Sequence, residues 1–130
     1  DSPRPTIFLA FGAGFAPVKS LIQHAMSLEL AESMELHWIA DAAGHYQDNL
    51  CRAWADALDN FVYAPHAREA DLAALLDRIA ADYPDLHRFD LYAAGAADDL
   101  AQAREVFLRH GLPAQRWFAD PLDARVAEPA

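Results

Sequence analysis

The chain has 130 residues, of which 54% are hydrophobic and 23% charged, and this composition favours one globular domain with a single core. The formal net charge of -10 argues against nucleic acid and against an anionic membrane surface as partners, since both would repel the chain. The single cysteine, Cys51, excludes an intramolecular disulfide and favours a cytoplasmic protein, and no segment approaches the roughly 18 to 20 apolar residues of a membrane span.

The N-terminal part of the chain indicates a strand, a turn and a helix. Residues 6–11 are a short apolar run between Pro5 and Gly12, which is typical of a strand buried on both faces. From Pro17 to about residue 30, apolar side chains recur at helical spacing. Proline suits the first helical position because no N–H is needed there.

The rest of the chain repeats this alternation. Pro65 is expected to close the third strand, and the tail after Asp120 is expected to fray. The carboxylates of Asp98 and Asp99 suit the positive end of the last helix dipole, and Gly111 is a suitable residue to end that helix. Further strands are predicted over 35–40, 61–64, 89–93 and 115–119, and further helices over 47–58, 69–81 and 98–111.

Strand and helix thus alternate along the whole chain, and we expect one α/β domain over residues 1–130. The pattern predicts a doubly wound parallel five-stranded sheet with strand order 3-2-1-4-5, right-handed crossovers and helices on both faces. The ligand site of such a sheet lies at the carboxyl ends of the strands, where the strand order reverses.

The turn after the first strand is the most informative short segment. Gly12-Ala13-Gly14 stands between a buried strand and a helix, with Pro17 in place of the third glycine of the dinucleotide fingerprint. Glycines here let the backbone turn tightly and let an anion approach the free N–H groups of the helix. The turn alone leaves two interpretations open, namely phosphate binding and a plain connection between strand and helix.

Five blocks together resemble the pyridine-nucleotide-binding domain of the ferredoxin reductase family of flavin enzymes. They look most like bacterial NADH-dependent ferredoxin or oxygenase reductases and deoxysugar reductases, and residues 4–11 resemble the join to the flavin barrel of that family. The first block is similar to the family pattern Gly-Gly-Thr-Gly-Ile-Ala-Pro. The blocks are Phe11-Gly12-Ala13-Gly14-Phe15-Ala16-Pro17, Trp38-Ile39-Ala40-Asp41 with Tyr46, Asn60-Phe61, Tyr92-Ala93-Ala94-Gly95-Ala96 and Gly111-Leu112-Pro113.

The resemblance implies the NAD(P)H-binding module of a longer flavin reductase, from which this chain is expected to be an excised piece. Its nicotinamide would be presented to FAD in an upstream barrel, and electrons would pass to an iron–sulfur domain or a protein acceptor. The isolated chain would hold no catalytic residue, bind no flavin and be inactive. The implied binding residues are Gly12 and Gly14 at the pyrophosphate, Ala13, Ala94 and Gly95 at the nicotinamide, Ala40 and Asp41 near the adenosine ribose, and Phe15, Ala16, Pro17 and Ala96 around them.

Departures from the family pattern, chiefly those at Ala13, Ala94 and Ala96, suggest an alternative. Ala13 replaces a hydroxyl residue, Ala94 a cysteine and Ala96 a proline, while Asp41 stands where the family has an arginine or similar residue. Because each change removes a polar or shape contact, the chain could instead be a degenerate, non-catalytic interaction or structural module that kept the fold and lost the nucleotide site.

The departure at Asp41 also predicts which nucleotide is bound. A carboxylate beside the ribose accepts hydrogen bonds from its hydroxyls and repels a 2′-phosphate, and no lysine or arginine lies between Glu35 and Leu50. NADH is therefore expected over NADPH. Any side chain at Gly14 is expected to block the pyrophosphate, so that Gly14→Val loses nucleotide binding while the fold survives.

Other residues suggest weaker hypotheses. His45 and His66 are expected to follow the second and third strands, but they lack metal-ligand spacing, and no metal site is predicted. Cys51 falls inside a predicted helix and is expected to be a small core residue rather than a reactive thiol. The three tryptophans, Trp38, Trp54 and Trp117, are expected to fill the core or an interface, and the other possibility is that Trp117 and Phe118 face a flavin in a neighbouring domain.

Overall fold

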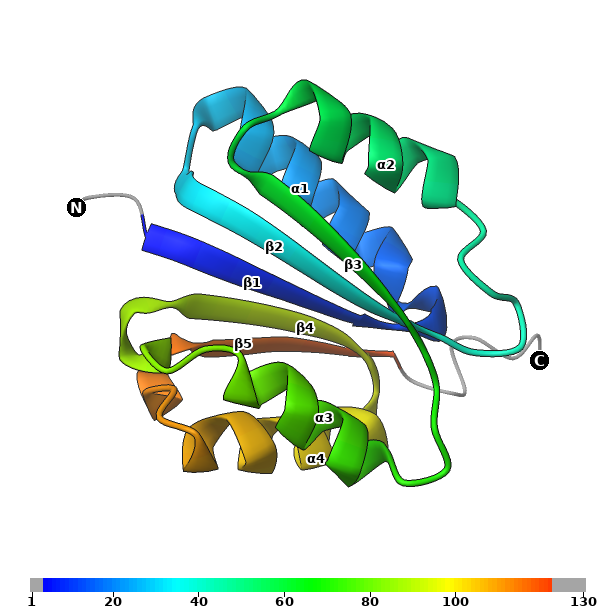
Figure 1. The fold of residues 1–130 in the computed structure, drawn as a ribbon, viewed down its shortest axis with the longest axis vertical. Helices are drawn as coiled ribbons and strands as arrows, with labels where there is room; N and C mark the ends of the chain where they lie inside the picture. The colour runs from blue at the N-terminus through cyan, green and yellow to red at the C-terminus, as the bar shows by residue number, and fades with distance from the viewer. Residues whose placement is uncertain (1–3, 123–130) are drawn as a thin grey trace.

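The computed structural model describes residues 4–122, which form one five-stranded sheet covered by helices on both faces (Figure 1). Three short 3-10 turns, Gly12–Gly14, Leu86–Arg88 and Ala114–Arg116, complete the described elements. The strands are β1 (Arg4–Phe11), β2 (Ala31–Ala40), β3 (Phe61–Ala67), β4 (Asp90–Ala96) and β5 (Trp117–Leu122), and the helices are α1 (Phe15–Leu28), α2 (Asp48–Ala57), α3 (Leu72–Ala81) and α4 (Ala97–Arg109).

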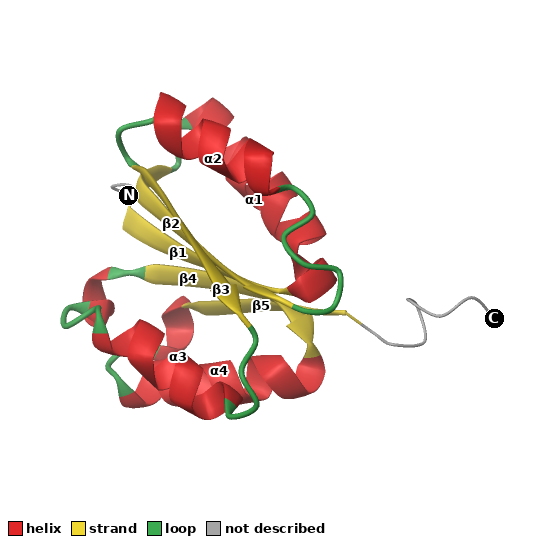
Figure 2. Ribbon diagram, turned by 45° about the vertical axis from the view of Figure 1, so that its right-hand side comes forward, coloured by secondary structure: helices red, strands yellow, loops and turns green. Residues whose placement is uncertain are grey.

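All neighbouring strands are parallel, and the strand order is β3-β2-β1-β4-β5, which confirms the predicted α/β fold and order. Helices α1 and α2 cover one face of the sheet, and α3 and α4 cover the other (Figure 2). The order reverses between β1 and β4, so the crevice expected for a ligand lies where these two strands end.

Two hydrophobic cores lie on opposite sides of the sheet, and β1 contributes to both. Ile7, Leu9 and Phe11 pack toward α3 and α4, whereas Phe8 and Ala10 pack toward α1. This explains the uninterrupted apolar run in β1, because a central parallel strand has no solvent-exposed face.

Two prolines occupy other positions in their elements than the sequence predicted. The prediction that Pro65 closes β3 was wrong, because β3 continues through Pro65 to Ala67 as an edge strand with one side free of a neighbour. Helix α1 begins at Phe15, so Pro17 is its third residue rather than its first. Pro17 is tolerated there because the first-turn N–H groups need no intrahelical partner.

Other boundaries differ by a few residues. β2 begins at Ala31, where it pairs with Arg4 of β1, and β4 continues to Ala96. Helix α3 begins only at Leu72, because the Asp71 carboxylate caps it by accepting a hydrogen bond from the Ala74 N–H at 3.1 Å. β5 extends to Leu122, past the expected start of the tail, and the remainder of that tail lies outside the described residues. In residues 4–122, no helix combines the length and apolarity needed to cross a membrane.

Candidate functional site

The turn between β1 and α1 is fixed by a tryptophan from the neighbouring strand. Gly12 has a left-handed φ of +55°, and its carbonyl oxygen accepts a hydrogen bond of 3.0 Å from Nε1 of the buried Trp38. The Trp38 ring also stacks on Phe15, with centroids 4.0 Å apart. Because Trp38 lies near the end of β2, this strand holds both the turn and the first residue of α1 in place.

Neither glycine of this turn has room for a side chain, because other atoms of the protein occupy the place where a Cβ would lie. A Cβ at Gly14 would lie 2.1 Å from the Ala94 carbonyl oxygen, so glycine is required for α1 to approach β4. A Cβ at Gly12 would lie 2.2 Å from Oδ2 of Asp41. A side chain at Gly14 would collide with the Ala94 backbone, so Gly14→Val would disturb the packing of α1 against β4 as well as the turn.

The N-terminus of α1 has the features of an anion site. No side chain caps it, and its first turn contains no acidic residue. Ala13 and Ala16 are exposed beside it, so no bulky side chain covers this end of the helix. The Phe15 N–H is bonded to carbonyls of the preceding 3-10 turn and Pro17 has none, so the attraction for a phosphate group at this edge comes chiefly from the positive end of the helix dipole.

Asp41 directly follows β2 and is exposed at the same edge. Its Oδ1 accepts a hydrogen bond of 3.0 Å from the Ala43 N–H, which fixes the carboxylate. Tyr46 lies nearby, edge-on to Trp38, and its pKa is raised by burial and by the charge of Asp41. The predicted ribose residue therefore lies beside the predicted phosphate turn.

The end of β4 forms the other side of the turn. Ala94 is buried and contacts the Gly14 side of α1, while a Cβ at Gly95 would lie 2.6 Å from Phe11 Cβ. Only Ala96 is exposed in this segment. The methyl group of Ala94 therefore packs in the core beside α1.

The structure thus brings all the predicted residues to one edge but exposes only some of them. Those that reach the surface are Ala13, Ala16, Asp41 and Ala96, with Pro17 half-buried, whereas Gly12, Gly14, Phe15, Ala40, Ala94 and Gly95 are buried. The predicted residues thus lie in neighbouring loops, and packing decides which of their side chains are exposed.

Arg68 also lies at this edge, and the sequence analysis did not single it out. It lines an open depression of about 650 Å³ between the ends of β2 and β3, together with Asp41 and His45. Its guanidinium makes two hydrogen bonds to Asp99 of α4, at 2.7 and 2.9 Å, and these bonds with the charges of Asp99 and Asp41 raise the pKa of Arg68. The available signal was the adjacency of β3 and β2 in the predicted strand order.

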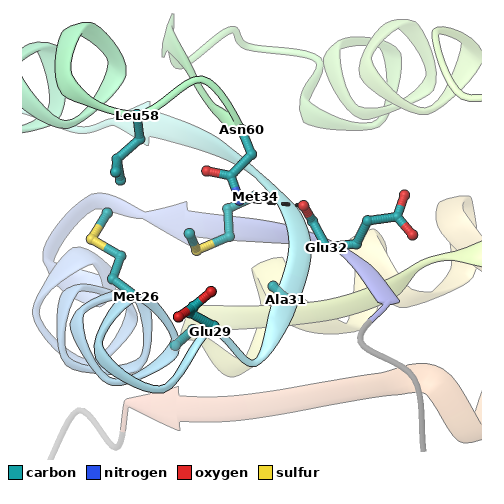
Figure 3. Close-up of a pocket in the computed structure, with 8 residues that line it drawn as sticks. Met26, Glu29, Ala31, Glu32, Met34, Leu58 and Asn60 are labelled. Carbon is teal, nitrogen blue, oxygen red and sulfur yellow. Dashed lines mark hydrogen bonds between the residues drawn. The ribbon is translucent and has the colours of Figure 1, made fainter.

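A second cavity, of about 670 Å³, lies at the opposite edge of the sheet (Figure 3). Met26 and Glu29 come from the end of α1, and Met34 comes from the early part of β2. The amide of Asn60 donates a hydrogen bond of 3.3 Å to the Glu32 carbonyl across it. None of the predicted site residues lines this cavity, so it is separate from the carboxyl edge.

The two histidines predicted to follow strands form hydrogen bonds with protein groups. His66 lies within β3 rather than after it, and its Nε2 is 2.9 Å from Nδ1 of the buried His37. His45 donates from Nε2 to the Trp38 carbonyl oxygen at 2.9 Å. Over residues 4–122, no three His, Cys, Asp or Glu side chains are grouped to hold a metal ion.

The lone thiol and the aromatic residues near the C-terminus are accounted for by packing. Cys51 is buried, and burial raises its pKa to about 12, which confirms a core residue rather than a reactive thiol. Trp117 packs against the core under α3 and α4. Phe118 is exposed and stacks on Tyr92, with ring centroids 4.7 Å apart.

Comparison with known proteins now adds to this geometry. No family model matches the sequence. The chain is 30% identical over 122 residues to the CDP-6-deoxy-L-threo-D-glycero-4-hexulose-3-dehydrase reductase of Yersinia pestis, covering 89% of this chain and 37% of that protein. It is 28% identical over 128 residues to the NAD(P)H-flavin reductase of Vibrio harveyi, covering 92% of this chain and 54% of that protein.

Among solved structures, the cytochrome P450 reductase GcoB of Amycolatopsis superposes with a TM-score of 0.78 at 17% identity, covering 93% of this chain and 38% of that one, which supports the fold. The chain spans about a third to a half of the relatives that it matches. Over nearly its whole described length the chain is homologous to the NAD(P)H-binding domains of flavin reductases of the ferredoxin reductase family.

Proposed function

We propose that this chain binds NADH at the carboxyl edge of its sheet, as the nucleotide-binding domain of a longer flavin reductase. The observation that carries the proposal is the uncapped N-terminus of α1 at the point where the strand order reverses, with Asp41 on one side and Ala96 on the other. Bound NADH would supply a hydride to FAD in an upstream domain, from which an iron–sulfur domain or a protein acceptor would take electrons.

The pyrophosphate is assigned to the backbone of the first turn of α1. The exposed neighbours Ala13 and Ala16 carry no polar group, so the attraction comes chiefly from the helix dipole. Pro17 offers no N–H, which removes one donor from this turn. We therefore expect weak affinity, with a dissociation constant on the order of 0.1 mM to 1 mM.

The adenosine ribose is assigned to Asp41. One of its oxygens already accepts the Ala43 N–H, and the exposed carboxylate has further lone pairs for ribose hydroxyls. A 2′-phosphate would bring negative charge toward the same carboxylate, so NADH is favoured over NADPH. The nicotinamide then lies toward Ala96, where this chain supplies shape and orientation and no acid or base.

The alternative is a nucleotide-free interaction or structural module, and one observation favours it. Oδ2 of Asp41 lies against Gly12, so a fixed negative charge borders the turn that would receive the pyrophosphate. Ala13 and Ala96 offer no polar side chain to offset it. If this reading is correct, neither NADH nor NADPH binds at several millimolar.

A titration of the chain with NADH and NADPH, followed by backbone amide chemical shifts, separates the two functions. We expect saturable shifts at residues 12–16 and 41–43, with NADPH weaker by about fivefold or more because of the charge at Asp41. Asp41→Asn should narrow that preference while leaving the backbone unchanged. Asp59→Asn removes the same charge just before β3, at the opposite edge, and should leave the preference intact.

Two results would count against the proposal. NADPH binding as tightly as NADH would refute the assignment of Asp41 to the ribose. Shifts confined to residues away from the carboxyl edge, or no shifts at all at several millimolar, would favour the nucleotide-free module.

A further inference from the structure

We infer that Arg68 is a second, masked determinant of nucleotide specificity, which Asp99 holds away from the position of a ribose 2′-phosphate. This inference rests on the proposed NADH site and adds to it a latch formed by residues from β3 and α4. Removing the Asp99 carboxylate should release the Arg68 guanidinium and allow nucleotides with a 2′-phosphate to bind.

The strand register places Arg68 beside Asp41. Ala67, the last residue of β3, pairs with Ala40, the last residue of β2, so Arg68 and Asp41 are the next residues along two adjacent parallel strands. Paired strands lie about 4.8 Å apart. Both side chains line the same depression of about 650 Å³, so Arg68 lies close to any group that binds to the Asp41 carboxylate.

Asp99 fixes the direction of the Arg68 side chain. Nη1 and Nη2 of Arg68 bond to Oδ2 and Oδ1 of Asp99 at 2.9 and 2.7 Å, which is the bidentate geometry that arginine also uses for phosphate. The Asp99 side chain is 13% exposed and that of Arg68 is 41% exposed, so the carboxylate is the more sheltered partner. The pair of guanidinium donors that points toward α4 is therefore occupied by Asp99.

The charges around the depression disfavour a ribose 2′-phosphate. Asp41 and Asp99 both act on Arg68, so its single positive charge is more than offset by two carboxylates. A 2′-phosphate would meet a net negative site whose arginine is already paired with a carboxylate. Without the Asp99 charge, the two Nη groups of Arg68 could pair with phosphate oxygens instead.

The test uses 5′-AMP and 2′,5′-ADP, two adenosine fragments that differ in the 2′-phosphate, titrated by chemical shift at low salt. Asp99→Asn should strengthen 2′,5′-ADP binding by about tenfold relative to 5′-AMP, because a bidentate charged contact replaces a repulsion. Adding Arg68→Ala to Asp99→Asn should abolish that gain. Asp98→Asn is the matched control, since the exposed Asp98 carries the same charge in the same turn of α4, and it should change the ratio by less than about twofold.

The outcomes separate this inference from the proposed function. If the unmodified chain binds 5′-AMP or NADH but Asp99→Asn leaves the ratio of the two fragments unchanged, the latch is refuted and the nucleotide site stands. If the unmodified chain binds neither fragment nor NADH, the site fails and the latch fails with it. Circular dichroism verifies the fold, and Asp99→Ser, another residue suited to a first helical turn, provides a second variant with the same expected gain.

Discussion

The two glycines after β1 serve different physical purposes although they lie two residues apart. Gly12 is needed for its left-handed φ of +55° and for the room that Asp41 occupies beside it. Gly14 has a φ of -59°, which any residue can adopt, and is needed only because α1 comes so close to the Ala94 carbonyl. A substitution at Gly14 therefore tests packing without a backbone penalty.

We predict that Gly14→Ala lowers the free energy of unfolding by about 2 to 3 kcal/mol, since its Cβ would lie 2.1 Å from backbone that cannot rotate away. Gly44→Ala is the control, because Gly44 has a φ of +70° but nothing within 4 Å of the added Cβ, and it should lose only about 1 kcal/mol. Urea unfolding measures both values. Equal losses at the two positions would contradict the steric explanation.

At the scale of elements, a chain of hydrogen bonds joins β2, β3 and the end of α3. Tyr83 donates to Oε1 of Glu35 at 2.8 Å, so its oxygen must accept from Nε2 of His37 at 2.6 Å. With its proton on Nε2, His37 can only accept at Nδ1, which makes Nε2 of His66 the donor. This order requires His37 to be neutral, because a protonated ring would have no nitrogen left to accept the hydrogen bond from His66.

The hydrogen-bond chain makes stability depend on pH in a defined direction. Burial, with a further effect of His66, lowers the pKa of His37 to about 3, so the unfolded chain binds the proton first. The contribution of neutral His37 to the free energy of unfolding should be fully present above about pH 6.5. As the pH drops from there toward 3, the free energy of unfolding should fall by up to about 1.4 kcal/mol per pH unit. The pKa of His66 is lowered too, chiefly by burial, which acts in the same direction.

Urea unfolding at pH 7.5 and pH 5.5 checks this prediction. His37→Gln should reduce the difference in unfolding free energy between the two pH values, because the variant lacks the group that titrates. His24→Gln, at an exposed position on α1, should leave the difference unchanged. A loss of stability on acidification that is the same in both variants would contradict the assignment to His37.

At the scale of the whole molecule, the net charge of -10 acts on every anionic ligand. This field is long-ranged at low salt and is screened over about 8 Å at physiological ionic strength. The contact between Asp41 and a ribose is short-ranged and is screened much less. The two contributions to a preference for NADH therefore differ in their dependence on salt.

We predict that raising NaCl from about 20 mM to 500 mM reduces the preference for NADH over NADPH by about twofold to threefold. The part of the preference that comes from the Asp41 contact should remain at high salt. Calorimetric or chemical-shift titrations at both concentrations measure the change. A preference that disappears completely in high salt would show that the overall field, rather than the Asp41 contact, discriminates between the nucleotides.

The sequence by itself determined the class of fold and the location of the candidate site. The apolar run of β1 and the alternation of strands and helices are local patterns, and a parallel sheet with short crossovers leaves few possible strand orders. The Gly12–Gly14 turn and Asp41 could be found because each directly follows a predicted strand, and parallel strands bring their carboxyl ends to one edge.

Only the tertiary structure decided which groups meet at that edge. Pro65 could continue β3 because the strand lies at the edge of the sheet, and Gly14 was restricted by a carbonyl from β4, far away in the sequence. The register of β2 and β3 places Arg68 beside Asp41, and an ion pair joins Arg68 to Asp99 of α4. The periodicity of apolar residues indicates which side of one segment faces the core. The contacts named here join segments that are far apart in the sequence, so no local sequence pattern predicts them.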